Sequence, residues 1–386
     1  MKLFKSLALI AIVLSLSISV FAQDDVETLQ SDAVSTYADI VYASYADSLE
    51  TATDLNDALI AFVAEPSEET LTGAQNAWLV ARDVYGQTEA YRFYGGPIDD
   101  EDGPEGQINA WPMDESYVDY VEGAPDAGII NNVDDFPEIT IDLLLSLNEE
   151  GGEENVATGY HAIEFLLWGQ DLSADSAGER PYTDYTSADN ADRRGEYLLL
   201  VGQLLVDDLQ TLVDAWSPEV EDNYRSDFLA LPTEDALSNI LTGIGVLAKS
   251  ELAGERIFTA YDNQDQEDEH SCFSDNTHAD IIANAQGVIN VYTGTYTSID
   301  GTEISGVAIA DIVESLDSDL NAELLALLDS VNVATHAIPV PFDQAIILPD
   351  GRDLVFETVT ALLDTGDKLV EVADAIGLTI DTALPE

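Results

Sequence analysis

Two side chains that could bind one metal ion lie three residues apart between Gly159 and Asp171 of this 386-residue chain. His161 and Glu164 occupy positions i and i+3 of a predicted helix, so both project from the same face. An imidazole and a carboxylate one helical turn apart can share a cation, as such pairs do in the metal sites of helix bundles. The spacing alone favours a core histidine paired with a glutamate. The apolar neighbours of Glu164 strengthen the metal interpretation, because a carboxylate inside an apolar segment must be paired or neutralised.

A second polar group lies on the face of a helix predicted over residues 67–94. The face consists of side chains that advance by four and three positions: Trp78, Arg82, Tyr85, Glu89 and Arg92. One interpretation is a buried or interfacial ion network, since arginines pair routinely with acids. The other is the edge of a site, where the two arginines position carboxylates.

A third group carries two acids on one face of a helix predicted over residues 232–260. Glu251 and Glu255 repel each other at this spacing unless a cation or an arginine lies between them. The neighbouring Arg256 could serve one of them. A metal site would instead require both acids to converge with His161 and Glu164.

Two of the four histidines and the only cysteine lie together in residues 267–278. The side chains concerned are His270, Ser271, Cys272 and His278. Their spacing does not match a standard zinc motif, and a closed structural site would need a further ligand. Two interpretations remain open, a local metal site and a loop anchored by hydrogen bonds.

Helical periodicity dominates the chain and predicts an all-α protein. We expect helices at about 31–64, 67–94, 137–147, 155–168, 188–216, 232–260, 274–293, 306–334 and 352–377. Long helices with modest loops favour two four-helix-bundle-like domains, residues 23–217 and 218–386. A weak echo between 83–88 and 290–295 suggests internal duplication. The irregular stretch 95–135 exceeds ordinary loop lengths, which indicates a functional or a mobile segment.

The charge of the chain excludes two classes of partner. The sequence contains 76 acidic and 12 basic residues, a formal net charge of −64. Nucleic acids and anionic membrane surfaces both require a basic patch. Because 46% of the residues are hydrophobic, the chain can still form a substantial core. Most of the acids are interpreted as a solvated surface adapted to saline surroundings.

The first 22 residues have the pattern of a secretory signal. Lys2 and Lys5 precede an apolar run over residues 7–21, and Ala22 offers a small residue for cleavage. The pattern predicts an exported protein without a stable membrane span after cleavage, although an uncleaved anchor is the alternative. Cleavage would remove two lysines and no acids, leaving 76 acidic residues and ten basic ones.

Several segments resemble the imelysin family. The segment from Gly159 to Asp171 matches the family pattern Gly-x-His-x-x-Glu, and residues 78–96 and 108–114 are also similar to that family. Residues 270–284 resemble its iron-regulated protein A branch. The resemblance covers about residues 35–375. It implies exported bacterial proteins with two helical-bundle domains, associated with iron uptake and historically labelled insulin-cleaving metallopeptidases.

The resemblance implies a metal or active site at the domain interface, with His161 and Glu164 at its centre and Glu89 and Asp114 beside them. Arg92 lies one turn from Glu89 and would oppose a cation there, which argues against a simple four-carboxylate iron site. Glu251 and Glu255 are added to the predicted set because they share one face of the helix predicted over residues 232–260. The supporting residues are Arg82, Arg92, Tyr85, Tyr160, Asp171, Arg256, His270, Ser271, Cys272 and His278.

The motif content favours binding over catalysis. A zinc peptidase needs about three protein ligands and a base, but His-Glu-x-x-His is absent and Phe165 breaks the inverted motif. We therefore expect a periplasmic or outer-membrane-associated bacterial protein that binds a metal ion or a small ligand. Iron is favoured, with zinc, calcium and manganese as alternatives, and other envelope iron-uptake components are expected partners. A metallopeptidase and an acidic glycan-binding or structural surface protein are the remaining hypotheses.

Overall fold

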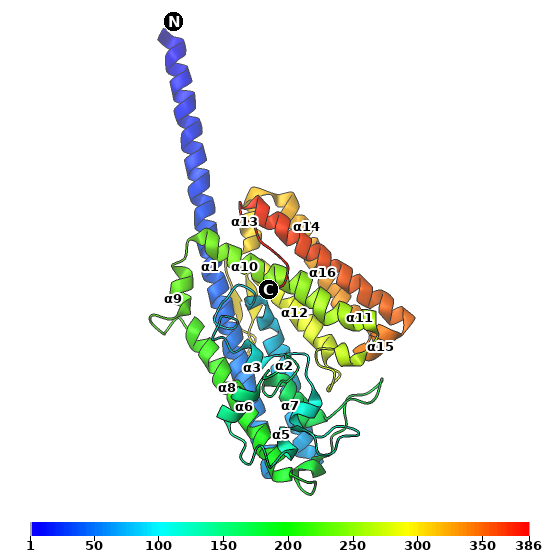
Figure 1. Cartoon of the computed structure of the whole chain (residues 1–386). Helices are drawn as coiled ribbons and strands as arrows, with labels where there is room; N and C mark the ends of the chain where they lie inside the picture. Colours follow the sequence, from blue (N-terminus) through cyan, green and yellow to red (C-terminus); the bar gives the residue numbers. More distant parts are fainter. Residues whose placement is uncertain (1, 386) are drawn as a thin grey trace.

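A computed structural model describes the backbone of residues 2–385 and the side chains of residues 26–385. The predicted signal segment, residues 1–22, therefore lies outside the residues whose side chains are described. The prediction of an all-α fold is confirmed (Figure 1). The longer helices are α1 (Lys2–Ala64), α2 (Glu68–Gly86), α7 (Gly159–Trp168), α8 (Ala191–Trp216), α10 (Thr233–Val246), α12 (Thr277–Thr293), α14 (Ser318–Ala337) and α16 (Pro349–Ala375).

Shorter elements connect these helices. They are η1 (Gln87–Tyr91), α3 (Glu105–Ile108), α4 (Glu115–Val118), α5 (Gly128–Asn131), α6 (Ile141–Leu147), η2 (Tyr182–Tyr185), α9 (Tyr224–Leu229), the π-helix η3 (Leu247–Phe258), α11 (Thr259–Asn263), η4 (Gln266–Asp268), α13 (Ile309–Leu316) and α15 (Phe342–Ile347). A hairpin of two antiparallel strands, β1 (Thr295–Thr297) and β2 (Glu303–Ser305), completes the described part of the chain.

The helix boundaries follow local capping chemistry. The backbone N–H of Thr70 donates to the Ser67 hydroxyl at 3.2 Å, which begins α2. The single helix predicted over 306–334 is wrong, because Asp317 leaves the helical conformation between α13 and α14. Its carboxylate accepts a hydrogen bond from the backbone of Leu320 at 3.1 Å and caps the second helix. The three-residue strands were not predicted because they are too short to show an alternating pattern.

The helices pack in two groups that meet at α12. In the N-terminal half, α1 packs against α2 and α8, and α7 packs against α2 and α8. In the C-terminal half, α16 packs against η3, α10 and α14 (Figure 1). Helix α12 contacts both groups, lying against α2 and η1 on one side and α14 and η3 on the other. The approach is close at Gly287, where a Cβ atom would lie 2.3 Å from the carbonyl oxygen of Gln87. The domain boundary at residue 217 and the internal duplication stay predictions.

Arginines hold the long irregular stretch 95–135 against the N-terminal helices. Arg194 of α8 and Arg180 both bind the buried carboxylate of Asp119, with N–O distances of 2.6 Å. Arg193 donates to the carbonyl oxygens of Ile130 at 2.8 Å and Phe136 at 2.7 Å. The stretch is therefore anchored at several points, and the carbonyl groups of Gln107 and Ile108 lie against the start of α7.

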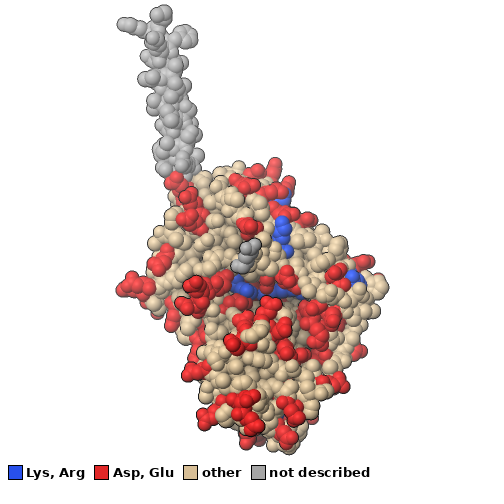
Figure 2. Space-filling model, viewed as in Figure 1, with Lys and Arg blue, Asp and Glu red and all other residues tan. Residues whose placement is uncertain are grey.

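The exterior of the protein is acidic, as the composition requires. Figure 2 shows Asp and Glu spread over the visible face, with Lys and Arg confined to a few places. No helix in the described part of the chain combines the length and the apolar character needed to cross a membrane.

The first residue of α7 generates a stability prediction. Gly159 has φ +82°, and a Cβ atom there would lie 2.4 Å from the carbonyl oxygen of Ile108. We expect Gly159→Ala to lower the free energy of unfolding by at least about 2 kcal/mol, because left-handed strain and a backbone clash add. Chemical denaturation monitored by circular dichroism measures the change.

Gly73→Ala is the matched control for that substitution. Gly73 lies inside α2, and a Cβ atom there meets no heavy atom within 4 Å. We expect this change to raise the free energy of unfolding by about 0.5–1 kcal/mol, since alanine favours the helix. Equal effects at the two positions would contradict the role of Gly159 in fixing α7.

Candidate functional site

The predicted metal-binding pair lies in the interior of the protein. His161 and Glu164 are both fully buried on α7, and Nδ1 of the imidazole lies 3.0 Å from Oε2 of the carboxyl group. The other carboxyl oxygen accepts hydrogen bonds from Ser274, at 2.9 Å from its backbone nitrogen and 2.6 Å from its hydroxyl. Nε2 of His161 is buried without a hydrogen-bond partner among the described residues. The pair thus leaves one imidazole nitrogen available for a ligand.

Burial moves both members of this pair towards their neutral forms. Desolvation lowers the pKa of His161 well below 6.5, and the positive charge of Arg82 lowers it further. Desolvation raises the pKa of Glu164 to about 8, although the hydrogen bond from Ser274 opposes that rise. Near neutral pH the centre therefore holds an uncharged imidazole beside a largely protonated carboxyl group.

A second histidine stands next to the first. His270 precedes α12, and its ring centroid lies 4.8 Å from that of His161. Its Nδ1 lies 3.1 Å from Oδ2 of Asp280 and 2.9 Å from Nη2 of Arg82. Both partners use the same ring nitrogen, so Nε2 remains for a ligand, as a donor in one tautomer and a metal ligand in the other. Burial and, to a smaller extent, the positive charge of Arg256 lower the pKa of His270 to about 4.

A buried ion pair supports the two histidines. Arg82 of α2 binds Asp280 of α12 through two contacts of 3.0 Å, and its Nη1 donates to Asn109. The hydroxyl of Ser271 also donates to Asp280 at 2.6 Å. Burial opposes ionisation of Asp280, but the guanidinium of Arg82 outweighs it and holds the pKa of that carboxyl below its usual range. Asp280 was not among the predicted residues, and it is the acid that pairs with Arg82.

Glu89 forms the next part of the network. Its Oε2 accepts from Arg92 at 2.7 Å and from Arg256 at 2.5 Å, while Oε1 accepts from Asn109 at 3.2 Å. Burial opposes ionisation of Glu89, but the two guanidinium groups lower its pKa below the usual range. Arg256 also binds Glu251 at 2.9 Å. The buried ion network proposed for the 67–94 stripe is therefore present, and Glu89 is occupied by two arginines.

A pocket of about 510 Å³ opens beside this network. Among its lining residues are Arg92, Asn109, Trp111, Glu149, Glu153, Glu251, Glu255, Arg256, Asp268 and His270. The ring centroid of Trp111 lies 4.7 Å from that of His161. Since Trp111 and His270 line the pocket and also contact His161, the imidazole lies one layer of side chains from the pocket.

The remaining predicted residues lie in several places. Asp114 is exposed, and its carboxylate caps α4 by accepting from the backbone N–H of Ser116 at 2.9 Å. Burial raises the pKa of the Cys272 thiol well above its ordinary value. His278 is half-buried, with Nδ1 3.2 Å from the carbonyl oxygen of Asp275.

The aromatic residues near the pair line its interior side. Tyr160 packs against Tyr85 with ring centroids 5.0 Å apart, and the guanidinium of Arg82 lies 5.5 Å from the Tyr160 ring. The Tyr85 hydroxyl is buried without a hydrogen-bond partner among the described residues. These rings pack around the guanidinium group of Arg82, which supports the histidines.

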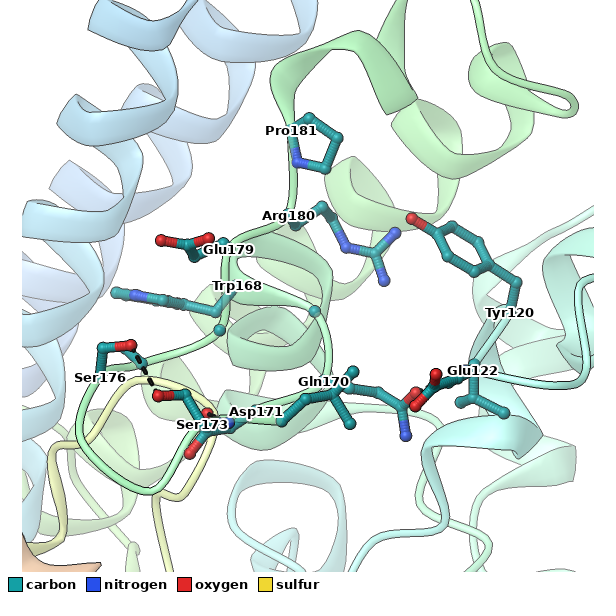
Figure 3. Close-up of a pocket in the computed structure, with 15 residues that line it drawn as sticks. Tyr120, Glu122, Trp168, Gln170, Asp171, Ser173, Ser176, Glu179, Arg180 and Pro181 are labelled. Carbon is teal, nitrogen blue, oxygen red and sulfur yellow. Dashed lines mark hydrogen bonds between the residues drawn. The ribbon is translucent and has the colours of Figure 1, made fainter.

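A second pocket, also about 510 Å³, follows the C-terminal end of α7. Figure 3 shows Tyr120, Trp168, Asp171 and Arg180 around it. Arg180 faces the ring of Tyr120, with its guanidinium carbon 5.1 Å from the ring centroid. The predicted supporting residue Asp171 thus lines this pocket and not the one beside His270.

The environment of Glu164 predicts a pH-dependent stability difference. Its folded pKa of about 8 exceeds the reference value of 4.5, so the folded chain binds more protons over that interval. Stability from this group is therefore lost as pH rises through about 8. Glutamine resembles the protonated form. We expect Glu164→Gln to become more stable relative to the unmodified protein by roughly 2 kcal/mol between about pH 6 and pH 9.

Denaturation of both proteins across that pH range measures this difference, and groups common to the two proteins cancel in the comparison. A difference that stays constant with pH would contradict the assignment of a protonated Glu164.

Comparisons with known proteins agree with this architecture. The family model described as imelysin matches residues 41–369. The chain is 27% identical over 341 residues to iron-regulated protein A of Synechococcus elongatus, covering 86% of this chain and 82% of the relative.

Two solved structures show the same fold. One is a candidate iron-regulated protein A precursor from Parabacteroides distasonis, with a TM-score of 0.69 and 20% identity over 90% of this chain and 95% of the other. The second is an imelysin-like protein from Psychrobacter arcticum, with a TM-score of 0.62 and 14% identity over 92% and 98%. Because the family match spans most of the sequence, the chain belongs to the imelysin family.

Proposed function

We propose that this imelysin family member serves bacterial iron acquisition by binding a metal ion, or a small ligand that carries one, at the centre formed by His161 and Glu164. The relative in Synechococcus elongatus is named an iron-regulated protein, which supports iron as the metal. The signal pattern at residues 1–22 supports export to the cell envelope. Other envelope components of iron uptake are the partners that this role requires.

The observation that carries the proposal is the buried Nε2 of His161, which has no hydrogen-bond partner among the described residues. An unsatisfied polar atom in the interior is costly unless a ligand satisfies it. Glu164 holds Nδ1 and Ser274 holds Glu164, so the ring orientation is fixed. Metal-binding histidines commonly have a carboxylate on the second nitrogen. Metal binding to His161 would therefore release the proton that Glu164 holds near neutral pH. We infer that Glu164 is a positioning residue for His161 and not a shared ligand.

The adjacent pocket supplies the remaining requirements of a metal centre. His270 lines the pocket beside His161 and leaves its own Nε2 for a ligand. Two histidines do not complete the coordination sphere of iron, so water or a bound small molecule must fill the other positions. The pocket lining contains more acidic than basic side chains, and its two arginines are already paired with Glu89. This balance of charge favours the approach of a cation.

The arrangement gives less support to a peptidase. A catalytic zinc site needs about three protein ligands and an open position. In the described part of the chain, the group of three or more converging ligand side chains consists of Asp171, Asp275 and Asp343 and does not include His161. A glycan-binding or structural role would leave the orphan imidazole without a function.

Removal of the imidazole tests the proposed centre. We expect the unmodified protein to bind one equivalent of Fe²⁺ under anaerobic conditions, and His161→Ala to lose that binding, because Nε2 is the proposed ligand. Isothermal titration calorimetry with Fe²⁺, Zn²⁺ and ferric citrate measures affinity and stoichiometry. His336→Ala is the matched control, since His336 is exposed near the end of α14. Equal, weak uptake by all three proteins would contradict the metal centre.

The positioning role of Glu164 gives a separate expectation. Glu164→Gln should weaken metal binding by about 10- to 100-fold, because the second nitrogen of His161 loses its carboxylate. Circular dichroism checks that the fold is retained, and Glu164→Asp should recover part of the affinity. A Glu164→Gln protein with unchanged affinity would refute this role. Cleavage of an unfolded polypeptide that disappears with Glu164→Gln and with a chelator would instead establish the peptidase.

A further inference from the structure

Four acidic side chains from three separate segments lie together at Asp171, which lines the second pocket. Asp171 follows α7, Glu269 follows η4, Asp275 precedes α12, and Asp343 lies in the first turn of α15. One carboxylate oxygen from each of the three aspartates lies within 4.8 Å of the others. Glu269 is fully buried with its carboxyl group next to that of Asp343, although it is not part of the group whose oxygens lie within 4.8 Å of one another. We call these four residues the acidic cluster.

The separation of the oxygens suits a single hard cation. Calcium binds oxygen ligands at about 2.3–2.6 Å, so two ligands of one ion lie at most about 5 Å apart. The limit of 4.8 Å among the three aspartates satisfies this condition. The three segments that carry them bring their carboxylates to one point although they are far apart in the sequence.

The cluster contains buried acceptors without donors. Asp343 and Glu269 are fully buried, and none of their carboxyl oxygens has a hydrogen bond of good geometry to a donor among the described residues. The two carboxyl groups lie next to each other, where only a shared proton could join them, and Thr277 lies beside Glu269. Oδ1 of Asp275 is buried and unpartnered as well. Native proteins seldom leave buried carboxylate oxygens unsatisfied, because the desolvation cost is not recovered. Three such acids together, beside the carboxylate of Asp171, therefore require a cation or protons.

Other buried acids in this protein show how the charge is normally balanced. Glu89, Asp119 and Asp280 each bind at least one arginine through contacts of 3.0 Å or less. In the acidic cluster, the charges that act on Asp275 belong to Asp343, Asp171 and Asp175, and all of them are acidic. Among the described residues, no arginine or lysine forms a salt bridge with any of the four acids of the cluster.

We propose that the acidic cluster binds one calcium ion through the carboxylates of Asp171, Asp275 and Asp343, with Glu269 adding negative charge beside Asp343. Oxygen-only ligands favour a hard cation over zinc or copper. Carboxylates from three separate segments suit calcium, which accepts six to eight oxygens in flexible geometry, better than magnesium, which requires a compact octahedron. The site is distinct from the histidine centre and does not depend on its function.

The pocket in Figure 3 provides a route for the ion, because Asp171 lines it. Asp171 keeps acceptor capacity for a cation while Oδ1 accepts from the backbone of Ser173 at 2.9 Å and Oδ2 from Gln266 at 3.1 Å. A bound ion would link the segment after α7 to the segments before α12 and at α15. We therefore expect calcium to stabilise the assembled fold.

The test compares thermal unfolding of the chelator-treated protein with and without Ca²⁺ in buffered 150 mM NaCl, which screens diffuse binding to the acidic surface. Calcium far above its dissociation constant should raise Tm by roughly 5 °C. Asp343→Asn should abolish this rise. Without calcium, the same variant should be at least as stable as the unmodified protein, since one repelling charge is removed. Calorimetric titration should give one Ca²⁺ per chain, with at least tenfold weaker binding of Mg²⁺.

Asp364→Asn is the matched control, because Asp364 is exposed on α16 and the substitution removes the same charge. This control should keep the full calcium response. Asp275→Asn provides a second variant if Asp343→Asn folds poorly, and it too should lose the response. An unmodified protein that calcium does not stabilise, an equal response in all variants, or a response to magnesium alone would overturn the proposal.

Discussion

The scarcity of positive charge is the constraint on which this structure depends. The full sequence has eight arginines and four lysines for 76 acids. Five of the arginines, Arg82, Arg180, Arg194, Arg225 and Arg256, are buried. Each of them binds at least one carboxylate. Because breaking such a pair leaves an uncompensated charge in the interior, these contacts fix the positions of the elements that carry them.

The placement of these arginines connects the two halves of the chain. Arg82 joins α2 to α12 through Asp280, and Arg256 joins η3 to η1 through Glu89. Asn109 bridges the two pairs, accepting from Arg82 and donating to Glu89. The histidine centre lies beside this bridge, so its geometry depends on ion pairs between segments almost two hundred residues apart in the sequence.

Sequence patterns predicted the faces of helices better than the partners of side chains. The stripe through Arg82, Glu89 and Arg92 correctly indicated buried polar groups, because helical spacing determines which residues share a face. It could not identify Asp280 or Ser274, since contacts between distant segments have no local signature. The break at Asp317 was also missed, because a single capping aspartate resembles a surface residue within a continuous helical pattern.

The same limit explains the uneven outcome for the predicted ligands. His161 and Glu164 lie together because the helix itself brings them together. Glu251 and Glu255 reach the pocket, whereas Asp114 is exposed and caps the short helix α4. The acidic cluster was invisible except for Asp171, which was selected for its place beside the motif and not for its partners. Chain spacing therefore identifies pairs within one element, while centres assembled from several loops require the structure.

Two solutions to the shortage of arginine now stand side by side. Glu164 is a single buried acid, and a proton can neutralise it, as its pKa of about 8 indicates. The acidic cluster contains four acids close together. Protonation could neutralise them too, but a bound cation would balance their charge while leaving the carboxylates ionised. Ser274 binds Glu164, and its neighbour Asp275 belongs to the cluster. One loop therefore contacts both centres. A cation that orders this loop at Asp275 would also fix Ser274, and through Glu164 the orientation of His161.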